Sequence, residues 1–191
     1  VSLGLFSHGI AFVTPLTPDE TILGLLVAQA KHGYQLLACF ADPDELGRIW
    51  NLGTSQLYAV LKRLESQGCI SGREVAAENA PTRTEYTLTP AGYERLEAWL
   101  YDAHPSASVH RIRVEFLSRL YVARLLNLPT LSIVRHQKMA CCEQYAILLE
   151  EQQQAAGGVG FLALELNIAQ LSAILQWIDR CEVVPKEENE P

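Results

Sequence analysis

The sequence predicts a mainly α-helical protein with one small β-hairpin. Three observations favour this fold class. Apolar residues recur at helical spacing over most of the chain, alternation with a period of two is confined to residues 70–88, and a threonine–proline pair precedes two of the helical segments. With 191 residues, of which 49% are hydrophobic, the chain is long enough to bury one core or two small ones.

The predicted elements follow one another with short connections. Residues 1–17 form an arm to which no structure is assigned. At the first helix, Thr17 is the predicted cap, Pro18 the first helical residue and Glu20 the partner in a capping box. Thr89 and Pro90 repeat the cap-plus-proline signal. The elements are helices at 18–30, 34–40 and 54–68, strands at 70–76 and 83–88 with a turn at 78–81, and a helix from residue 90.

The third helix has two different faces when its residues are placed at 100° intervals. One face carries Leu57, Val60, Leu61 and Leu64 and is predicted to enter the core. The opposite face carries small or polar residues and one lysine, namely Ser55, Ala59, Lys62 and Ser66, with Tyr58 and Arg63 at its flanks.

Only helices are predicted beyond a linker at residues 104–108. Residues 112, 116, 120 and 123 form one apolar stripe, and residues 131–148 form another. The last helix repeats apolar residues at alternating spacings of three and four, which is typical of a heptad seam. That seam consists of Phe161, Leu164, Ile168, Leu171, Leu175 and Ile178.

Composition and charge limit the function classes. The 15 basic and 22 acidic residues give a net charge of −7, so nucleic-acid binding must rest on a local surface. The five cysteines are odd in number and show no C-x-x-C spacing, which argues against a disulfide framework or a zinc site. The adjacent Cys141 and Cys142 are either an oxidant sensor or two ordinary helical thiols.

The sequence shows no signal for membrane insertion, secretion or catalysis. No uninterrupted apolar run reaches the roughly 18 residues of a membrane-spanning helix, and the first 14 residues lack the basic flank of a secretory signal. We therefore expect a cytoplasmic protein that binds no membrane. The sequence has none of the phosphate-binding, zinc-protease or serine-hydrolase motifs, and its histidines show no ligand spacing, so we expect neither an enzyme nor a metal or cofactor.

Three helices, a hairpin and a further helix are the layout of a winged helix-turn-helix domain. Residues 18–103 also resemble the N-terminal domain of PadR-like transcriptional regulators in five blocks that occur in the family's order. The blocks are ILGLL at 22–26, HGYQL at 32–36 with Trp50, GTSQLY at 53–58 running into LKRLE at 61–65, QG at 67–68 and YTLTPAG at 86–92. The C-terminal helices resemble the longer helical domain of one PadR subgroup in pattern and length.

The resemblance implies a DNA-binding domain at 18–103, a helical dimerisation domain at 109–181 and an acidic tail at 182–191. In this interpretation Ser55 and Gln56 meet base edges, with Gln56 placed for adenine, and Ala59 touches a thymine methyl. Thr54 caps the helix, whose N–H groups also hold a phosphate. The remaining predicted DNA contacts are Tyr58, Lys62 and Arg63 on the helix, and Arg73, Thr82 and Arg83 on the wing.

The resemblance further implies a homodimer that binds an inverted repeat, most often as a repressor, and release by a small apolar or phenolic effector. The predicted dimer contacts are Phe116, Leu120 and the six seam residues. Effector candidates are Tyr93 and Trp99, with His104 and His110 beside them. Two alternatives remain open at this point. One is a winged-helix interaction adaptor without DNA binding, favoured by the net charge of −5 in residues 1–103, and the other is a small-molecule sensor with no DNA role.

Overall fold

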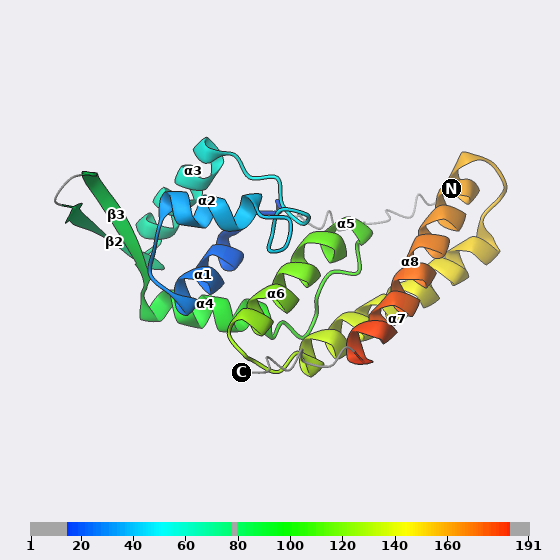
Figure 1. Ribbon diagram of the computed structural model, residues 1–191. Helices are drawn as coiled ribbons and strands as arrows, with labels where there is room; N and C mark the ends of the chain where they lie inside the picture. Colours follow the sequence, from blue (N-terminus) through cyan, green and yellow to red (C-terminus); the bar gives the residue numbers. More distant parts are fainter. Residues whose placement is uncertain (1–14, 78–79, 184–191) are drawn as a thin grey trace, which may run out of the picture.

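Helices and a small antiparallel sheet make up the first half of the chain, and the part of the second half that the structure describes contains helices alone (Figure 1). The structure, a computed structural model, describes residues 15–77 and 80–183. The first half contains α1 (Asp19–Ala28), β1 (Lys31–His32), α2 (Gly33–Ala41), α3 (Thr54–Ser66), β2 (Ile70–Ala77), β3 (Ala80–Leu88) and α4 (Pro90–Leu100). This order confirms the predicted fold class.

The helix starts show which capping predictions hold. At α4 the Thr89 side chain accepts a hydrogen bond from the N–H of Gly92 at 3.2 Å, and Pro90 occupies the first turn as predicted. Helix α1 instead begins at Asp19, and its N-cap is Pro18, so Thr17 does not cap it. Asp19 favours this start because a carboxylate is stabilised by the helix dipole at the N-terminus.

The sheet has the strand order β1-β3-β2, with both neighbouring pairs antiparallel. Strand β1 was not predicted, since two residues are too few to show alternation; they pair with β3 through Lys31 opposite Tyr86. The predicted turn at 78–81 is shorter than expected, because residues 80 and 81 already belong to β3, while residues 78 and 79 lie outside the described part.

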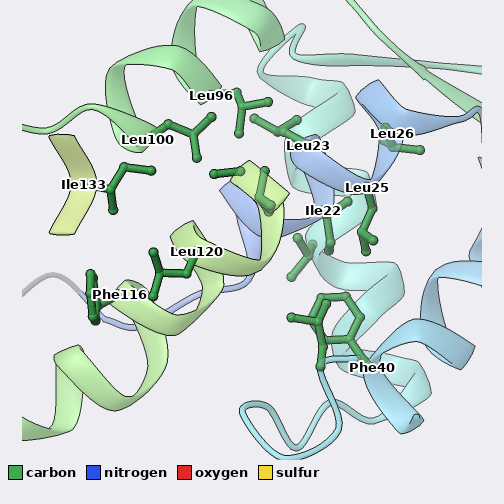
Figure 2. Close-up of a cluster of buried hydrophobic side chains, with 14 of the residues drawn as sticks. Ile22, Leu23, Leu25, Leu26, Phe40, Leu96, Leu100, Phe116, Leu120 and Ile133 are labelled. Atoms are coloured by element: carbon green, nitrogen blue, oxygen red, sulfur yellow. The ribbon is translucent and has the colours of Figure 1, made fainter. Parts of the chain in front are cut away.

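One apolar core runs from the winged-helix half into the C-terminal helices. Figure 2 shows Leu23 of α1 beside Leu96 of α4, Ile22 and Leu25 of α1 on the side towards Phe40, and Leu100 of α4 near Ile133. Trp50 adds a polar link, since its Nε1 donates to Ser118 Oγ at 2.9 Å. The predicted linker at 104–108 is a loop between helices, but the core continues across it.

The C-terminal half begins with one continuous helical segment that contains a π-helical turn. It consists of α5 (Val109–Arg111), the π turn (Ile112–Phe116) and α6 (Leu117–Leu125), and α6 packs on α1. Phe116 and Leu120, predicted to contact a partner chain, are instead buried in this chain's own core, where the Phe116 ring meets Trp177 edge-on. They are therefore no longer dimer candidates.

Helices α7 (Leu131–Gln154) and α8 (Val159–Val183) form a long hairpin that projects from the rest of the molecule (Figure 1). Within the predicted seam, Leu171 and Ile178 are buried, and the other four residues are half-buried. The seam is thus largely occupied within the chain. Other apolar side chains of the hairpin are exposed, namely Met139, Ile147, Val159, Leu162 and Leu166.

Helix α8 also bears on the expectation that no segment spans a membrane. Over Val159–Cys181 it is long and apolar enough to do so by length and composition, with a mean hydropathy of 1.4. The expectation was based on uninterrupted runs and therefore missed this helix, in which Glu165 is one of the interruptions. Leu171 and Ile178 nevertheless face the protein, as in a helix of a packed hairpin.

Candidate nucleic-acid interface

Helix α3 separates a buried face from an exposed one, as its sequence predicts. Leu57, Val60, Leu61 and Leu64 are all buried, and they hold the helix against the core. The opposite face points to solvent and carries Thr54, Ser55, Gln56, Tyr58, Ala59 and Lys62, all of them exposed. A helix that presents short polar groups and a lysine in this way has the chemistry needed to lie in a major groove.

The start of α3 differs in detail from the prediction. Gly53 is the N-cap residue and Thr54 is the first residue of the helix, so Thr54 does not cap it. The side chain of Gln56 supplies the capping interaction instead, because its Oε1 accepts a hydrogen bond from the N–H of Gly53 at 3.0 Å. The amide nitrogen of Gln56 remains a donor, which suits a base acceptor such as adenine N7.

Arg63 does not join the other predicted contacts. Its Nε donates to Asp19 Oδ2 at 3.0 Å, and its Nη2 pairs with the second oxygen of the same carboxylate. The hydrogen bond to Asp19 raises the pKa of the Arg63 guanidinium. Arg63 therefore ties α3 to α1, and the predicted phosphate contact by Arg63 is withdrawn.

The wing brings two further arginines to the surface. Arg73 of β2 and Arg83 of β3 are both exposed, and Arg73 lies opposite Glu85, whose carboxylate is 3.7 Å from the Arg73 guanidinium. That pair is weak, because the Arg73 side chain is 80% exposed. Thr82 lies in β3, but its side chain is outside the described ones.

An aromatic cluster at the root of the wing was not predicted. The Arg83 guanidinium lies 5.1 Å from the ring centroid of Tyr34 and donates to its hydroxyl at 3.1 Å. Tyr34 also stacks on His32 at 5.9 Å, and it is 52% exposed. A Cβ on Gly33 would come within 2.8 Å of the Tyr58 hydroxyl, so the glycine lets α2 begin beside α3. His32, Gly33 and Tyr34 all belong to the HGYQL block, but helical periodicity alone gave no reason to place them at a functional surface.

Acidic residues surround these basic groups. Glu65 follows Lys62 along α3, and its carboxylate accepts from the N–H of Gly72 in β2 at 3.1 Å, which ties it to the wing. Glu74 of β2 is exposed. No ion pair involves Lys62 within the described ranges, so its ammonium group is available to a phosphate.

A cavity of about 730 Å³ lies where the winged-helix half meets the C-terminal helices. Trp50, Trp99 and three arginines are among the side chains that line it, together with His104, Asp102 and Glu115. Tyr93, the other effector candidate, is 51% exposed on α4 and does not line this cavity. His110 lines a separate cavity of about 440 Å³.

Arg119 is the most buried of the cavity's arginines. Its guanidinium lies 5.4 Å from the Trp99 ring centroid and donates to Asp102 at 3.1 Å. The Nε atom is buried and has no hydrogen-bond partner among the described residues, and burial lowers the pKa of the side chain. Buried N–H donors are normally hydrogen-bonded, to protein, to water or to a bound molecule.

The cysteines and acidic residues form no second site among the described residues. Cys141 is buried, and burial raises the pKa of its thiol, whereas Cys142 is exposed. All five cysteines are free, and no group of three or more His, Cys, Asp or Glu side chains within residues 15–77 and 80–183 is arranged to hold a metal ion.

Comparison with known proteins finds a family match in the N-terminal half of the chain. The family model described as the transcriptional regulator PadR-like family matches residues 22–98. The negative transcriptional regulator PadR of Bacillus subtilis (strain 168) is 32% identical over 106 residues, which are 56% of this chain and 56% of that protein. The chain thus spans about half the length of this curated relative. Both the family and the relative are transcriptional regulators, not enzymes, as the sequence predicted.

Solved structures of other proteins superimpose on this chain only in part. Bacillus subtilis PadR in complex with operator DNA has a TM-score of 0.44 and 23% identity, and the overlap covers 85% of this chain and 95% of that one. A PadR family regulator from Clostridium difficile R20291 has a TM-score of 0.37 and 26% identity, covering 41% and 78%. The matched segment runs from α1 through the hairpin to α4, so residues 22–98 of this chain are similar to the transcriptional regulator PadR-like family.

Proposed function

We propose that the protein is a transcriptional regulator that binds duplex DNA through the outer face of α3. The observation that carries this proposal is the division of α3 into a buried apolar face and an exposed polar one. Ser55 and Gln56 lie at the N-terminal end, where recognition helices meet base edges. Ala59, one turn further, is exposed and small enough to approach a thymine methyl.

Phosphate contacts come from the basic and hydroxyl groups beside that face. Lys62 and Tyr58 of α3 flank the base-reading residues, and Arg83 extends from the wing with its guanidinium held over Tyr34. Arg73 and Thr82 complete the proposed wing contact. Because these contacts are charged, affinity for DNA falls as the salt concentration rises, with a slope set by the number of phosphates that are neutralised.

A second copy of the chain is the proposed partner of the α7–α8 hairpin. Leu162 and Leu166 of α8 are 61% and 59% exposed, and Met139 and Ile147 of α7 are 60% and 49% exposed. Exposed apolar side chains of this number on one hairpin favour a protein interface. We place the dimer contact on these residues, next to the seam rather than on it, and prefer a second copy to lipid because α8 is already packed on α7.

Two such chains present two α3 helices to one duplex. When the helices are about 34 Å apart, they meet successive major grooves on one side of an inverted repeat. We propose that binding represses transcription, as the word negative in the name of the Bacillus subtilis relative suggests. A protein of this kind acts where the DNA is, so we place it in the cytoplasm.

The junction cavity is the proposed effector site. Trp50 and Trp99 offer flat apolar surfaces, and Arg95, Arg111 and Arg119 line the same cavity with guanidinium groups, so a planar aromatic acid has the matching chemistry. Bacillus subtilis PadR has been crystallised with p-coumaric acid, an acid of that type. We therefore choose p-coumaric acid as the first probe, and we leave Tyr93 out of the site.

An interaction adaptor without DNA binding is the competing function. It is favoured by the exposed carboxylates next to the proposed DNA face, Glu65 and Glu74, and by Glu85 opposite Arg73. Like charges repel the phosphate backbone, so these groups reduce affinity for any duplex. The basic groups on the same surface favour the DNA-binding proposal instead.

Selection from a random duplex pool with the purified chain separates the two functions. The proposal predicts enrichment of an inverted repeat whose half-sites are about one helical turn apart. A pool that shows no enrichment at low salt, together with no affinity for bulk DNA, would contradict it and leave the adaptor.

A further inference from the structure

A buried carboxylate connects α1 with α3 and α4. The side chain of Asp19 is 3% exposed, and its Oδ2 accepts from Arg63 Nε at 3.0 Å and from Arg95 Nη2 at 3.2 Å. Its other oxygen pairs with Arg63. Because a buried charge is tolerated only with partners, both arginines are needed to hold Asp19.

Arg95 extends these contacts in two directions. Its Nε and Nη2 donate to Glu20 Oε1 at 3.0 and 2.8 Å, and its Nη1 donates to Gln67 Oε1 at 2.6 Å. Gln67 is the residue that directly follows α3, so Arg95 touches the end of α3 as well as the start of α1. We call the four charged side chains the Asp19 network; they are Asp19, Glu20, Arg63 and Arg95.

The Asp19 network reaches the junction cavity. Glu20 and Arg95 line that cavity, and their side chains are 20% and 32% exposed. Asp102 and Glu115 line it too, but they pair with Arg119 and Arg111 of the C-terminal helices. One part of the cavity wall is therefore linked by ion pairs to the inner flank of α3, and another part is not.

We propose that ion pairing at this part of the cavity wall controls the local stability of α3 through Asp19 and Arg63. Asp19 and Arg95 are positioning residues, because neither touches the proposed DNA face. An anionic group that enters the cavity beside Arg95 competes with Asp19 and Glu20 for its N–H groups. The buried Asp19, which ties α1 to Arg63 of α3, then keeps only one of its two arginines. The inference rests on the proposed function only in taking α3 as the helix that contacts DNA.

Amide hydrogen exchange of residues 54–66 in the full chain, without DNA, tests the coupling directly. Glu20→Gln removes a charge from the cavity wall without touching α3, and Glu115→Gln makes the same change at the unlinked part of the wall. We expect Glu20→Gln to accelerate exchange in α3 by about three- to tenfold, the effect of weakening one charged hydrogen bond. Glu115→Gln should change the exchange rate of α3 by less than about twofold.

Two further variants distinguish a local effect on α3 from a general loss of stability. Arg95→Lys keeps the charge but loses the fork of N–H groups, so it should act like Glu20→Gln. In an Arg63→Lys background, adding Glu20→Gln should accelerate exchange in α3 less than it does in the unsubstituted chain, because only the contact of Arg95 with Gln67 still links Glu20 to α3. Exchange that rises equally in all helices, that changes only in α1 and α4, or that responds alike to Glu115→Gln would overturn the inference. Failure of the unsubstituted chain to bind selected DNA would reject the proposed function without altering this test.

Discussion

The guanidinium of Arg83 on β3 lies over the ring of Tyr34 on α2 and donates to its hydroxyl at 3.1 Å. This contact fixes the root of the wing against the start of α2, while Arg83 stays exposed. A planar guanidinium has five N–H donors, so the remaining donors are free to meet a phosphate.

Replacing Tyr34 should therefore weaken DNA binding without unfolding the protein. We expect Tyr34→Ala to lower affinity for the selected duplex by about two- to fivefold, the effect of one exposed cation–π contact, and Tyr34→Phe to lower it less. Tyr93→Ala is the matched control, because Tyr93 is equally exposed on α4. Fluorescence anisotropy measures the affinity, and equal effects of the Tyr34 and Tyr93 variants would contradict the role of Tyr34.

Two residues of α3 should differ in the kind of binding defect they cause. Lys62→Ala should weaken binding to every sequence and flatten the salt dependence by about 0.9 for each phosphate that the variant no longer neutralises. Gln56→Ala should instead relax the preference at one base position, by about 1–3 kcal/mol. Titrations on matched and mismatched duplexes at several salt concentrations separate these outcomes. If neither variant changes either quantity, the assignment of the α3 face is wrong.

The bond between Trp50 and Ser118 should stabilise the junction of the two halves. Ser118 is fully buried, so Ser118→Ala leaves the indole N–H without its partner. We expect the free energy of unfolding to fall by about 1–3 kcal/mol. Ser71→Ala, at an exposed position of β2, is the control and should change it by less than about 0.5 kcal/mol. Urea unfolding that shows equal values for the two variants would argue against a stabilising bond.

Charge placed on the outer face of α8 should separate the proposed dimer. Leu162 and Leu166 are exposed in the chain, so Leu162→Glu with Leu166→Glu should leave the fold intact and raise the dimer Kd at least about a hundredfold, because a charge is buried without a partner. Gln153→Glu with Gln154→Glu adds the same two charges at exposed positions of α7 and is the control. Light scattering reports the mass, and an unsubstituted chain that is monomeric at micromolar concentration would exclude this interface.

Stability should decline at alkaline pH, in part through Cys39. Burial, with a hydrogen bond to Glu45, raises the pKa of the Cys39 thiol to about 11. The folded chain then holds a proton that the unfolded chain loses above its own pKa of about 8.5, so the contribution is complete below that pH and is lost as the pH rises towards 11.

Urea unfolding between neutral and alkaline pH checks this effect. Cys39→Ala should reduce the slope of the free energy of unfolding against pH above the pKa of a free thiol, while Cys142→Ala, at an exposed position, should not. Identical slopes for the unsubstituted chain and Cys39→Ala would show that the buried thiol is not a source of the alkaline decline.

The winged-helix half was predictable because its signals are local. The apolar spacing of Leu57, Val60, Leu61 and Leu64 identified the buried face of α3, and Thr89 with Pro90 marked the start of α4. Strand β1 was missed because two residues carry no periodicity and pair only through the tertiary fold. The cap of α3 was misassigned because a glycine can take the N-cap position when the Gln56 side chain supplies the hydrogen bond.

Contacts between segments that are distant in the sequence were harder to predict. The seam in α8 has the spacing of a helix interface, but spacing alone does not distinguish a partner in the same chain from a second copy, and here α7 takes most of it. Phe116 and Leu120 failed as dimer contacts for the same reason. Arg63 was predicted at the DNA face because its angle places it at the flank, and only the fold shows that Asp19, 44 residues away in sequence, lies within hydrogen-bond distance.

Photo-crosslinking from position 59 shows whether the outer face of α3 enters the major groove. Ala59 lies in the middle of the exposed face of α3, and replacing it with a photoreactive phenylalanine derivative leaves the buried face untouched. On the selected duplex, we expect crosslinks to bases at two symmetry-related positions about 34 Å apart. If the protein still binds the duplex but position 59 crosslinks to no base, then α3 does not enter the groove.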